Sequence, residues 1–467
     1  MQVQWLNKRT LGLVLACGSL LYLNSCKLGK ELEEPSMSVP EAFTNDTLEQ
    51  AQAATDTVAW WLLFEDTVLN ALVNEALENN RDLGIAMQRV EQARLQTKIS
   101  KADFGPKFNM AVQAGRGNYQ GLLLPNPSYN FFAGTSMNWE LDLWGKYRNL
   151  NDKAKSELVA SAYGQQAIEL SLISEVSRQY FLLLEYETSL DVALKTTELR
   201  KETVEIIQAR FDQGIVAEID LNQSQIQYEI ARSSIPVFER LVKITKLNIN
   251  LLTGSLPRDF ETQMELESAQ LKSEIPTGIP AQVLARRPDV QQAWYQALAQ
   301  NSMIGVAQAN RLPALSLSGT LGLAGNDFSD LGGLSAGWNL GGSLLGPIFY
   351  WNQNLRAVDI QRSLTRQQVL NYENTVLTAV NEVEASLITI ETAKTNIEAS
   401  ESRTIAAVNA LDLSNQRYDQ GVTSYLEVLE SQRQAFDAEL NLAKARSALL
   451  QAYVALYKST GGGWTRQ

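Results

Sequence analysis

The amino-acid sequence contains one pattern twice, displaced by a constant step of 207 residues (421 − 214 = 207). The segment Arg210-Phe211-Asp212-Gln213-Gly214-Ile215 returns as Arg417-Tyr418-Asp419-Gln420-Gly421-Val422. Further landmarks keep the same spacing: Asp82 and Asp289, Pro106 and Pro313, Trp144 and Trp351. Because these landmarks stay in register with no net insertion or deletion, we expect two structurally equivalent halves.

The N-terminus has the layout of a secretory signal. Lys8 and Arg9 precede an apolar run, Leu11 to Leu23, that is too short to span a bilayer comfortably. Small residues then lead to Cys26, a pattern that resembles a bacterial lipobox. The sequence therefore predicts a signal peptide over 1–25, lipidation of Cys26 with anchoring in membrane lipid, and an extended segment over 26–59. An ordinary signal peptide with an incidental cysteine is the alternative.

Composition excludes several classes of function. The formal net charge is −12 and becomes −14 when Lys8 and Arg9 leave with the signal (−12 − 2), which argues against nucleic acid as a partner. Histidine is absent from the sequence, so the commonest general base and the commonest metal ligand are missing. We therefore expect no enzyme, no cofactor and no metal site.

Each half contains two segments with the alternation of β-strands, at about 107–143 and about 314–349. The second half shows this most clearly, because Leu315, Leu317, Leu321 and Leu323 alternate with small or polar residues. Period two over about ten residues fits a transmembrane β-strand with one apolar and one polar face. A hairpin packed on a soluble core is the alternative.

A long helical segment follows each pair of strands. Residues 147–213 contain no proline and a single glycine, and residues 350–420 contain neither. Helices of about 60 residues would be about 90–100 Å long. Seven-residue ladders along both helices predict side-by-side packing with supercoil: Val176, Leu183, Leu190, Thr197, Val204 and Phe211, then Val383, Ile390, Ile397, Thr404, Leu411 and Tyr418.

The pattern predicts a complete domain organisation. Repeat 1 spans 60–254, with a helix over about 82–102, the two strands and a long helix pair over about 147–253. A proline-containing linker follows over 255–280. Repeat 2 spans 281–461, with its helix pair over about 351–460, and 462–467 form a tail. Second helices at about 219–252 and 426–457 return antiparallel to the first. A coiled-coil spacer with no other function is a competing interpretation of the helices.

Four strands per chain constrain the assembly. The smallest membrane barrels have about eight strands, and an open sheet edge in lipid leaves unpaired backbone groups at several kcal/mol each. If the strands lie in a membrane, the barrel must therefore be shared between two, three or four copies. Helices of this length would extend such a barrel into a long conduit.

Several motifs carry a family resemblance. The segments concerned are Trp60-Trp61, Asn79-Asn80-Arg81-Asp82-Leu83, Trp139-Glu140-Leu141-Asp142-Leu143-Trp144-Gly145, Leu284-Ala285-Arg286-Arg287-Pro288-Asp289-Val290 and Gly346-Pro347-Ile348-Phe349. They are similar to signatures of the TolC-like outer-membrane efflux proteins, in the lipoprotein branch that serves RND-type multidrug pumps. The resemblance covers essentially the whole mature chain.

The resemblance implies a mainly α fold with a membrane β part. Four strands per chain would contribute to a homotrimeric, 12-stranded β-barrel that continues as a long α-helical barrel in the periplasm. The trimer would be the exit duct of a tripartite system, docked to a periplasmic adaptor and an inner-membrane RND-type transporter. A trimeric coiled-coil lipoprotein that bridges the envelope, and a duct for protein secretion, are the alternatives. The sequence does not identify the exported compounds.

The resemblance also implies a gate at the periplasmic end of the tunnel. Glu427 and Glu430 are three residues apart and share a helix face. With Asp220 in the matching segment, they would ring the mouth and favour cations. Many relatives have aspartate at these positions, and some have a basic residue near Thr423 that closes the gate. The alternative for each carboxylate is a solvated surface charge.

The remaining candidate site is the Arg-aromatic-x-x-Gly motif at each helix tip. It comprises Arg210, Phe211 and Gly214, then Arg417, Tyr418 and Gly421. The resemblance implies contact with the adaptor here. Glycine also suits a left-handed helix C-cap, and arginine complements the helix dipole, so a purely structural role is the alternative.

Overall fold

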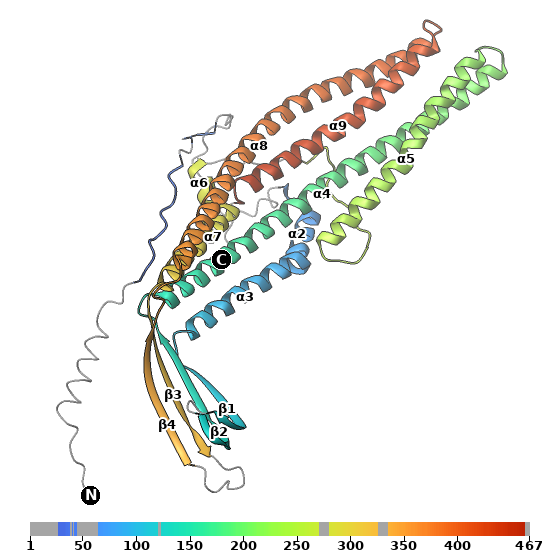
Figure 1. Ribbon diagram of the computed structural model, residues 1–467. Helices are drawn as coiled ribbons and strands as arrows, with labels where there is room; N and C mark the ends of the chain where they lie inside the picture. The colour runs from blue at the N-terminus through green and yellow to red at the C-terminus, as the bar shows by residue number, and fades with distance from the viewer. Residues whose placement is uncertain are drawn as a thin grey trace. The chain divides into compact units, whose positions relative to one another are not determined.

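The computed structural model describes residues 27–37, 40, 42–43, 64–119, 123–269, 280–325 and 335–462. The predicted signal peptide, Cys26 and Trp60-Trp61 lie outside the described residues, as do part of the predicted linker and most of the predicted tail. Figure 1 shows the elements and their order along the chain.

The two halves contain the same elements in the same order. The first half consists of α2 (Thr67–Asn79), α3 (Arg81–Ala102), β1 (Lys107–Tyr119), β2 (Leu123–Leu141), α4 (Lys146–Asp212) and α5 (Glu218–Leu252). The second consists of α6 (Pro280–Arg286), α7 (Pro288–Ala309), β3 (Ala314–Gly325), β4 (Ser335–Leu345), α8 (Gln353–Asp419) and α9 (Tyr425–Ser459). Helix α8 begins and ends 207 residues after α4 (353 − 146 and 419 − 212), so the predicted duplication is confirmed.

Helices α4 and α8 each contain 67 residues, and α5 and α9 each contain 35. At 1.5 Å per residue, α4 and α8 are each about 100 Å long. Every position of the two heptad ladders is buried or half-buried within the single chain. None of the described helices combines the length and apolarity that crossing a membrane requires.

The four strands form one antiparallel sheet in the order β1-β2-β3-β4. The two hairpins have equivalent registers, because Lys107 pairs with Asn138 and Ala314 pairs with Leu345. Strands β2 and β3 join the hairpins, with Leu141 opposite Leu315. In the described part of the chain, the outer edges of β1 and β4 carry no further strand.

The register gathers the apolar side chains of all four strands on one face of the sheet. Met137 lies opposite Phe108, Trp139 opposite Leu317, and Trp338 opposite Leu321. Small and polar residues form the other face, where Ser136 lies opposite Thr320. The predicted alternation is therefore continuous across the sheet. Several apolar side chains of this face, such as Met110, are largely exposed in the single chain.

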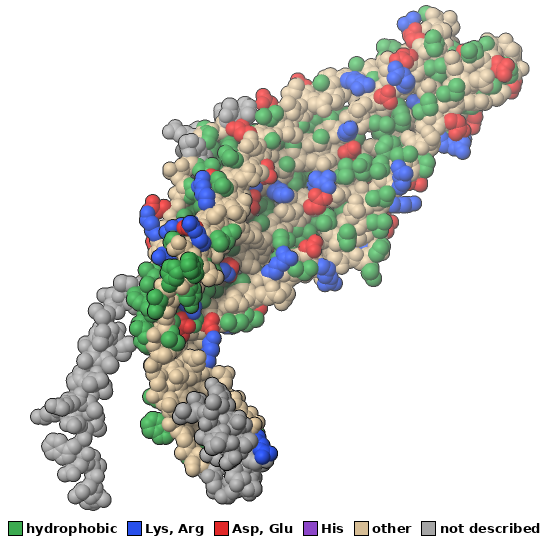
Figure 2. Space-filling view, viewed as in Figure 1, with side chains coloured by type: hydrophobic (Ala, Val, Ile, Leu, Met, Phe, Trp, Pro, Cys, Tyr) green, Lys and Arg blue, Asp and Glu red, His purple; other side chains and the backbone are tan. Residues whose placement is uncertain are grey.

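The chain divides into two compact units. Unit 1 comprises 1–36, 89–162 and 292–373, and includes the sheet. Unit 2 comprises 37–88, 163–291 and 374–467, and includes both turns between the long helices. The main apolar core of unit 2 surrounds the fully buried Tyr180, Phe181 and Leu456. On the face shown in Figure 2, acidic and basic side chains are interspersed along the helices, with neither sign gathered into one patch.

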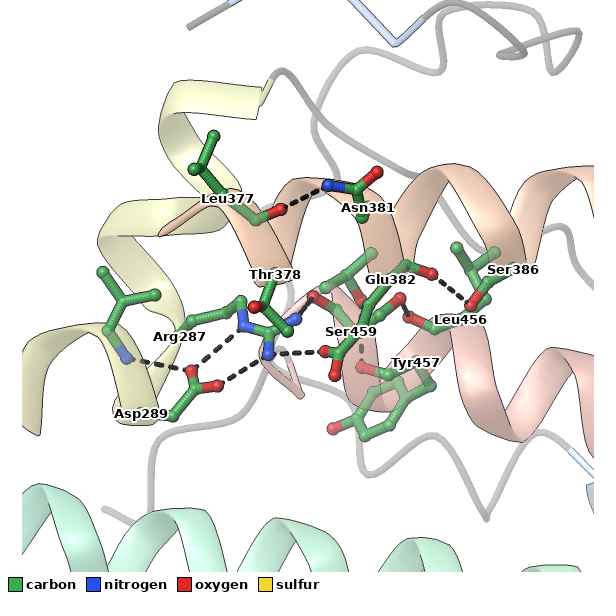
Figure 3. A network of polar contacts seen from close by, with 12 residues as sticks. Arg287, Asp289, Leu377, Thr378, Asn381, Glu382, Ser386, Leu456, Tyr457 and Ser459 are labelled. Atoms are coloured by element: carbon green, nitrogen blue, oxygen red, sulfur yellow. Dashed lines mark hydrogen bonds and ion pairs between the residues drawn. The ribbon is translucent and has the colours of Figure 1, made fainter. Parts of the chain in front are cut away.

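Arg287 connects three helices of unit 2 (Figure 3). It lies between α6 and α7, and its side chain is only 7% exposed. Its Nε and Nη2 donate to the two carboxylate oxygens of Asp289 at 3.0 and 2.6 Å, and Nη2 also donates to Glu382 at 2.6 Å. Its Nη1 donates to the backbone oxygen of Ser459 at 2.8 Å. One side chain thus fixes the start of α7 to α8 and to the last turn of α9.

Candidate gate at the helix tips

The two tips, residues 210–218 and 417–425, turn in the same way. At the first tip Ile215 N donates to Arg210 O at 2.9 Å, and Gly214 N donates to Phe211 O at 2.8 Å. Equivalent bonds of 2.9 Å form at the second tip, and Gly214 and Gly421 have φ of 72° and 73°. This is the Schellman motif, in which glycine adopts the left-handed conformation at no steric cost. The C-cap role of the two glycines follows directly.

An apolar cluster connects the two tips. Its buried members are Ile207, Leu221, Tyr425, Val428 and Leu429, and Phe211, Val216 and Tyr418 pack against them. The rings of Tyr418 and Tyr425 lie 5.2 Å apart. The aromatic residues of both tip motifs therefore serve, at least in part, to pack one tip against the other.

The two tip arginines have different partners although their positions in the repeats are equivalent. Arg210 Nη2 forms an ion pair with Asp419 Oδ1 of the other tip at 2.8 Å and stacks over the Tyr418 ring at 5.2 Å. Arg417 Nη1 pairs with Glu427 Oε1 of its own helix pair at 3.3 Å. Arg210 thus connects the two tips, and Arg417 acts within one of them.

The candidate gate carboxylates are engaged by neighbours. Glu427 is half-buried and accepts a hydrogen bond from the Thr423 hydroxyl, in addition to its ion pair with Arg417. Glu430 is exposed and pairs with Arg433 at 2.6 Å. Hydrogen bonds from Arg433 and Gln434 hold the pKa of Glu430 below its usual value. Asp220 is half-buried in the first turn of α5. Thr423 thus contacts a candidate gate carboxylate.

Sequence reasoning missed Arg200, a buried arginine on α4 that precedes the tip residue Arg210 in the sequence. It is 3% exposed. Its Nη1 donates to Gln227 O of α5 at 2.7 Å and its Nη2 to Gln432 O of α9 at 3.2 Å, while its guanidinium lies 5.0 Å from the Phe436 ring. Burial lowers its pKa. The available signal was a break in the repeat, because Ala407 occupies the equivalent position (200 + 207).

The residues that follow Cys26 lie against the start of α4 in unit 1. Lys27 forms a 2.6 Å ion pair with Asp152, and Leu28 N donates to Trp144 O at 3.2 Å. Gly145 has φ of 78°, and a Cβ atom added there would lie 3.0 Å from Lys27 Cα. The described chain therefore begins beside the segment where β2 ends and α4 begins.

No group of three or more Cys, Asp or Glu side chains among the described residues is arranged to hold a metal ion.

A duplicated chain whose two hairpins share one sheet, and whose long helices turn back at paired tips, defines the class of outer-membrane export channels. A model of the family "Outer membrane efflux protein" matches residues 72–255 and 279–462. The two matched segments are themselves 207 residues apart (279 − 72 and 462 − 255). The chain belongs to this family, and the resemblance noted in its motifs is confirmed.

Individual relatives agree over nearly their whole length. "Cation efflux system protein CusC" of Escherichia coli strain K12 is 28% identical over 450 residues, covering 95% of this chain and 97% of that protein. "Solvent efflux pump outer membrane protein SrpC" of Pseudomonas putida is 29% identical over 464 residues, covering 96% and 97%. The crystal structure of the Campylobacter jejuni CmeC outer membrane channel superimposes with a TM-score of 0.87 at 27% identity, covering 94% and 95%. The protein is an outer-membrane efflux channel with a periplasmic helical tunnel.

Proposed function

We propose that the chain is the passive exit duct of a tripartite efflux system. Three copies would form a 12-stranded barrel in the outer membrane and a continuous helical tunnel in the periplasm. A periplasmic adaptor and an inner-membrane RND-type transporter would deliver the exported compounds. The observation that carries the proposal is a four-stranded sheet with an apolar face and two outer edges that carry no strand in the described chain.

Such a sheet is incomplete in lipid. Its outer strands expose backbone N–H and C=O groups that cost several kcal/mol each when no partner or water satisfies them. Four strands are too few to close on themselves, since the smallest membrane barrels have about eight. Three copies would supply twelve strands and leave no free edge.

An exposed apolar stripe on α5 supports lateral assembly of the helices. Its members recur at steps of three, four or seven residues, as in a heptad pattern, and are exposed in the single chain: Ile219, Ile226, Ile230, Val237, Ile244, Leu247 and Leu251. A heptad stripe of this kind is the seam by which long helices pack side by side. A second copy of the chain, which carries long helices of matching length, is the natural partner.

We infer that Glu427, Glu430 and Asp220 form the cation-attracting constriction of this duct. Threefold symmetry would repeat each carboxylate three times around the mouth of the tunnel, and rings of carboxylates favour cations. Glu427 contacts Arg417 and Thr423, so part of its charge is balanced within the chain. The exposed Glu430 would contribute the larger share of the field.

The proposal extends to the adaptor contact at the tips. The backbone turns at Gly214 and Gly421 would present the docking surface. The side chains of Arg210, Phe211, Arg417 and Tyr418 would hold these turns in position through their packing and ion pairs. Among the exposed side chains at the turns are the apolar Ile215 and Val422. Two apolar side chains at the same position of equivalent turns suit an adaptor that meets both tips in the same way.

Planar-bilayer recording of the purified protein tests the proposal. We expect discrete conductance steps with cation preference, and we expect Glu427→Gln combined with Glu430→Gln to weaken that preference several-fold. Because the pKa of Glu430 is held below its usual value, the carboxylate stays charged in mild acid. The preference should therefore decline only as pH falls through that lowered pKa.

The matched control is Glu391→Gln combined with Glu398→Gln, two exposed carboxylates on α8 away from the tips. It removes the same charge and should leave selectivity unchanged. A parent protein without conductance steps would instead support the structural spacer. Equal effects of the two double variants would remove Glu427 and Glu430 from the constriction.

We further propose that Cys26 carries acyl chains that anchor the N-terminus in the outer membrane. Lys27 and Leu28 lie beside the start of α4, next to the end of β2. An anchor in the periplasmic leaflet of the outer membrane would have to begin at this end of the strands. Intact-mass measurement should find lipid on the parent protein and none on Cys26→Ser, which should still assemble because the strands insert by themselves. A parent mass without lipid refutes the anchor.

A further inference from the structure

We propose that neighbouring copies join through a second version of a joint that the chain already contains between β2 and β3. The inference rests on the proposed assembly and adds the strand register and one side-chain contact of the interface. It would place β4 of one copy against β1 of the next, with Trp351 closing the joint on Pro106 of the neighbouring copy.

The internal joint has two parts, both within unit 1. Strands β2 and β3 pair over eleven positions, among them Asn138 with Ser318. Just beyond the strands, Trp144 Nε1 donates to Pro313 O at 2.8 Å. The tryptophan thereby fixes the segment that leads into α4 to the segment that leads into β3.

The duplication converts this joint into a prediction for the outer edges. Adding 207 to a position in β2 gives its equivalent in β4, and subtracting 207 from a position in β3 gives its equivalent in β1. Asn138 opposite Ser318 therefore becomes Leu345 opposite Ala111 (138 + 207 and 318 − 207). The step is justified because the two hairpins already obey it, with Lys107 opposite Asn138 and Ala314 opposite Leu345.

The same operation turns Trp144 and Pro313 into Trp351 and Pro106. Trp351 is 85% exposed in the single chain, and Pro106 is exposed as well. Figure 2 shows hydrophobic side chains gathered where the strands of unit 1 continue into its helices. The residues that precede Trp351 in this part of the chain include several exposed apolar ones. These are Leu344, Leu345, Ile348, Phe349 and Tyr350. A patch of this kind marks an interaction surface, and a tryptophan can fill a pocket while its N–H finds an acceptor.

The faces of the sheet provide an independent check of the register. Leu344 would lie opposite Val112, and both belong to the apolar face that the described strands share. A slip of one residue would bring the apolar face of one copy against the polar face of the next, because side chains alternate with a period of two. A slip of two residues would preserve the faces but would move Trp351 away from Pro106. The register and the tryptophan contact therefore stand or fall together.

Disulfide trapping tests the register. Residues directly opposite on antiparallel strands have Cβ atoms about 4.5–5.5 Å apart, and diagonal neighbours about 7–8 Å, which is too far for a disulfide. We expect Leu345→Cys combined with Ala111→Cys to form covalent oligomers on oxidation at least about tenfold faster than the slipped pairs. The slipped controls combine Leu345→Cys with Gln113→Cys or with Asn109→Cys.

The tryptophan contact has its own test. Trp351→Phe should lower the temperature at which the oligomer dissociates on unheated gels, and alanine at Pro106 should leave it unchanged because the acceptor is a backbone oxygen. Faster trapping of a slipped pair, or an unchanged dissociation temperature for Trp351→Phe, overturns the inference while the oligomer remains. A parent protein that forms no oligomer at all overturns the proposed assembly as well.

Discussion

The two halves of the chain have the same order of elements, but different side chains make the equivalent contact to the last turn of α5 and of α9. In the first half, Asn80 Nδ2 donates to Leu252 O in the last turn of α5 at 2.9 Å. In the second half, Arg287 occupies the equivalent position (80 + 207) and donates to Ser459 O, the equivalent carbonyl (252 + 207), at 2.8 Å. The contact to the backbone is preserved, whereas the side chain that makes it is not.

The charge of Arg287 brings further partners that Asn80 cannot engage. Arg287 pairs with Asp289 and Glu382. Glu175, the first-half equivalent of Glu382 (382 − 207), pairs instead with Arg178 on its own helix at 2.6 Å. The comparison shows that duplication preserves the positions where the backbone needs a donor, while ion pairs around those positions can diverge between the halves.

The largest predicted difference between the halves follows from these contacts. Arg287→Ala removes a buried side chain that donates to two partly exposed carboxylates and to the Ser459 carbonyl, and should cost about 2–3 kcal/mol of unfolding free energy. Asn80→Ala removes a neutral hydrogen bond and should cost about 1–2 kcal/mol. Chemical unfolding of the purified protein in detergent, followed by circular dichroism, measures both. Equal losses would mean that the ion pairs of Arg287 contribute nothing beyond its backbone contact.

Two equivalent glycines near these contacts, Gly254 and Gly461, predict a smaller difference in unfolding free energy. Here the first half should be the more sensitive to substitution. Gly254 and Gly461 have φ of 69° and 87°, so alanine at either position should cost about 1–2 kcal/mol for the left-handed backbone alone. A Cβ at Gly254 would also lie 2.4 Å from Asn79 O, whereas at Gly461 the nearest atom, Arg287 N, lies 3.1 Å away. Gly254→Ala should therefore destabilise more than Gly461→Ala in the same unfolding assay. The reverse order would contradict the close packing of the first half.

These contrasts separate what the sequence could predict from what it could not. The repeat, the alternation of Leu315 to Leu323 and the long segments without proline are local patterns, and they predicted the halves, the sheet and the helices. Arg200, Arg210 and Lys27 find partners far away in the chain. Those pairings depend on how one helix is rotated against another, which no local pattern encodes. Equivalence under the repeat was even misleading for Arg210 and Arg417, because it suggested one shared role.

The substitutions with the smallest predicted effect on stability are also those that best distinguish the roles of the two tips. Arg210 and Arg417 form partly exposed ion pairs, and exposed pairs contribute only about 0–1 kcal/mol. Arg210→Gln and Arg417→Gln should therefore unfold at nearly the same denaturant concentration as the parent.

Their conductance should nevertheless differ, because the two ion pairs connect different parts. Arg210→Gln breaks the bond between the tips and leaves Asp419 unpaired, so the tips should separate more readily and the open-state conductance should rise. Arg417→Gln leaves the tips joined but frees the Glu427 carboxylate, so cation preference should increase while the conductance changes little. Single-channel recording of both variants under one salt gradient distinguishes these outcomes. If both variants changed the same property, the tips would act as equivalent parts of a single gate, and the difference between Arg210 and Arg417 would have no functional consequence.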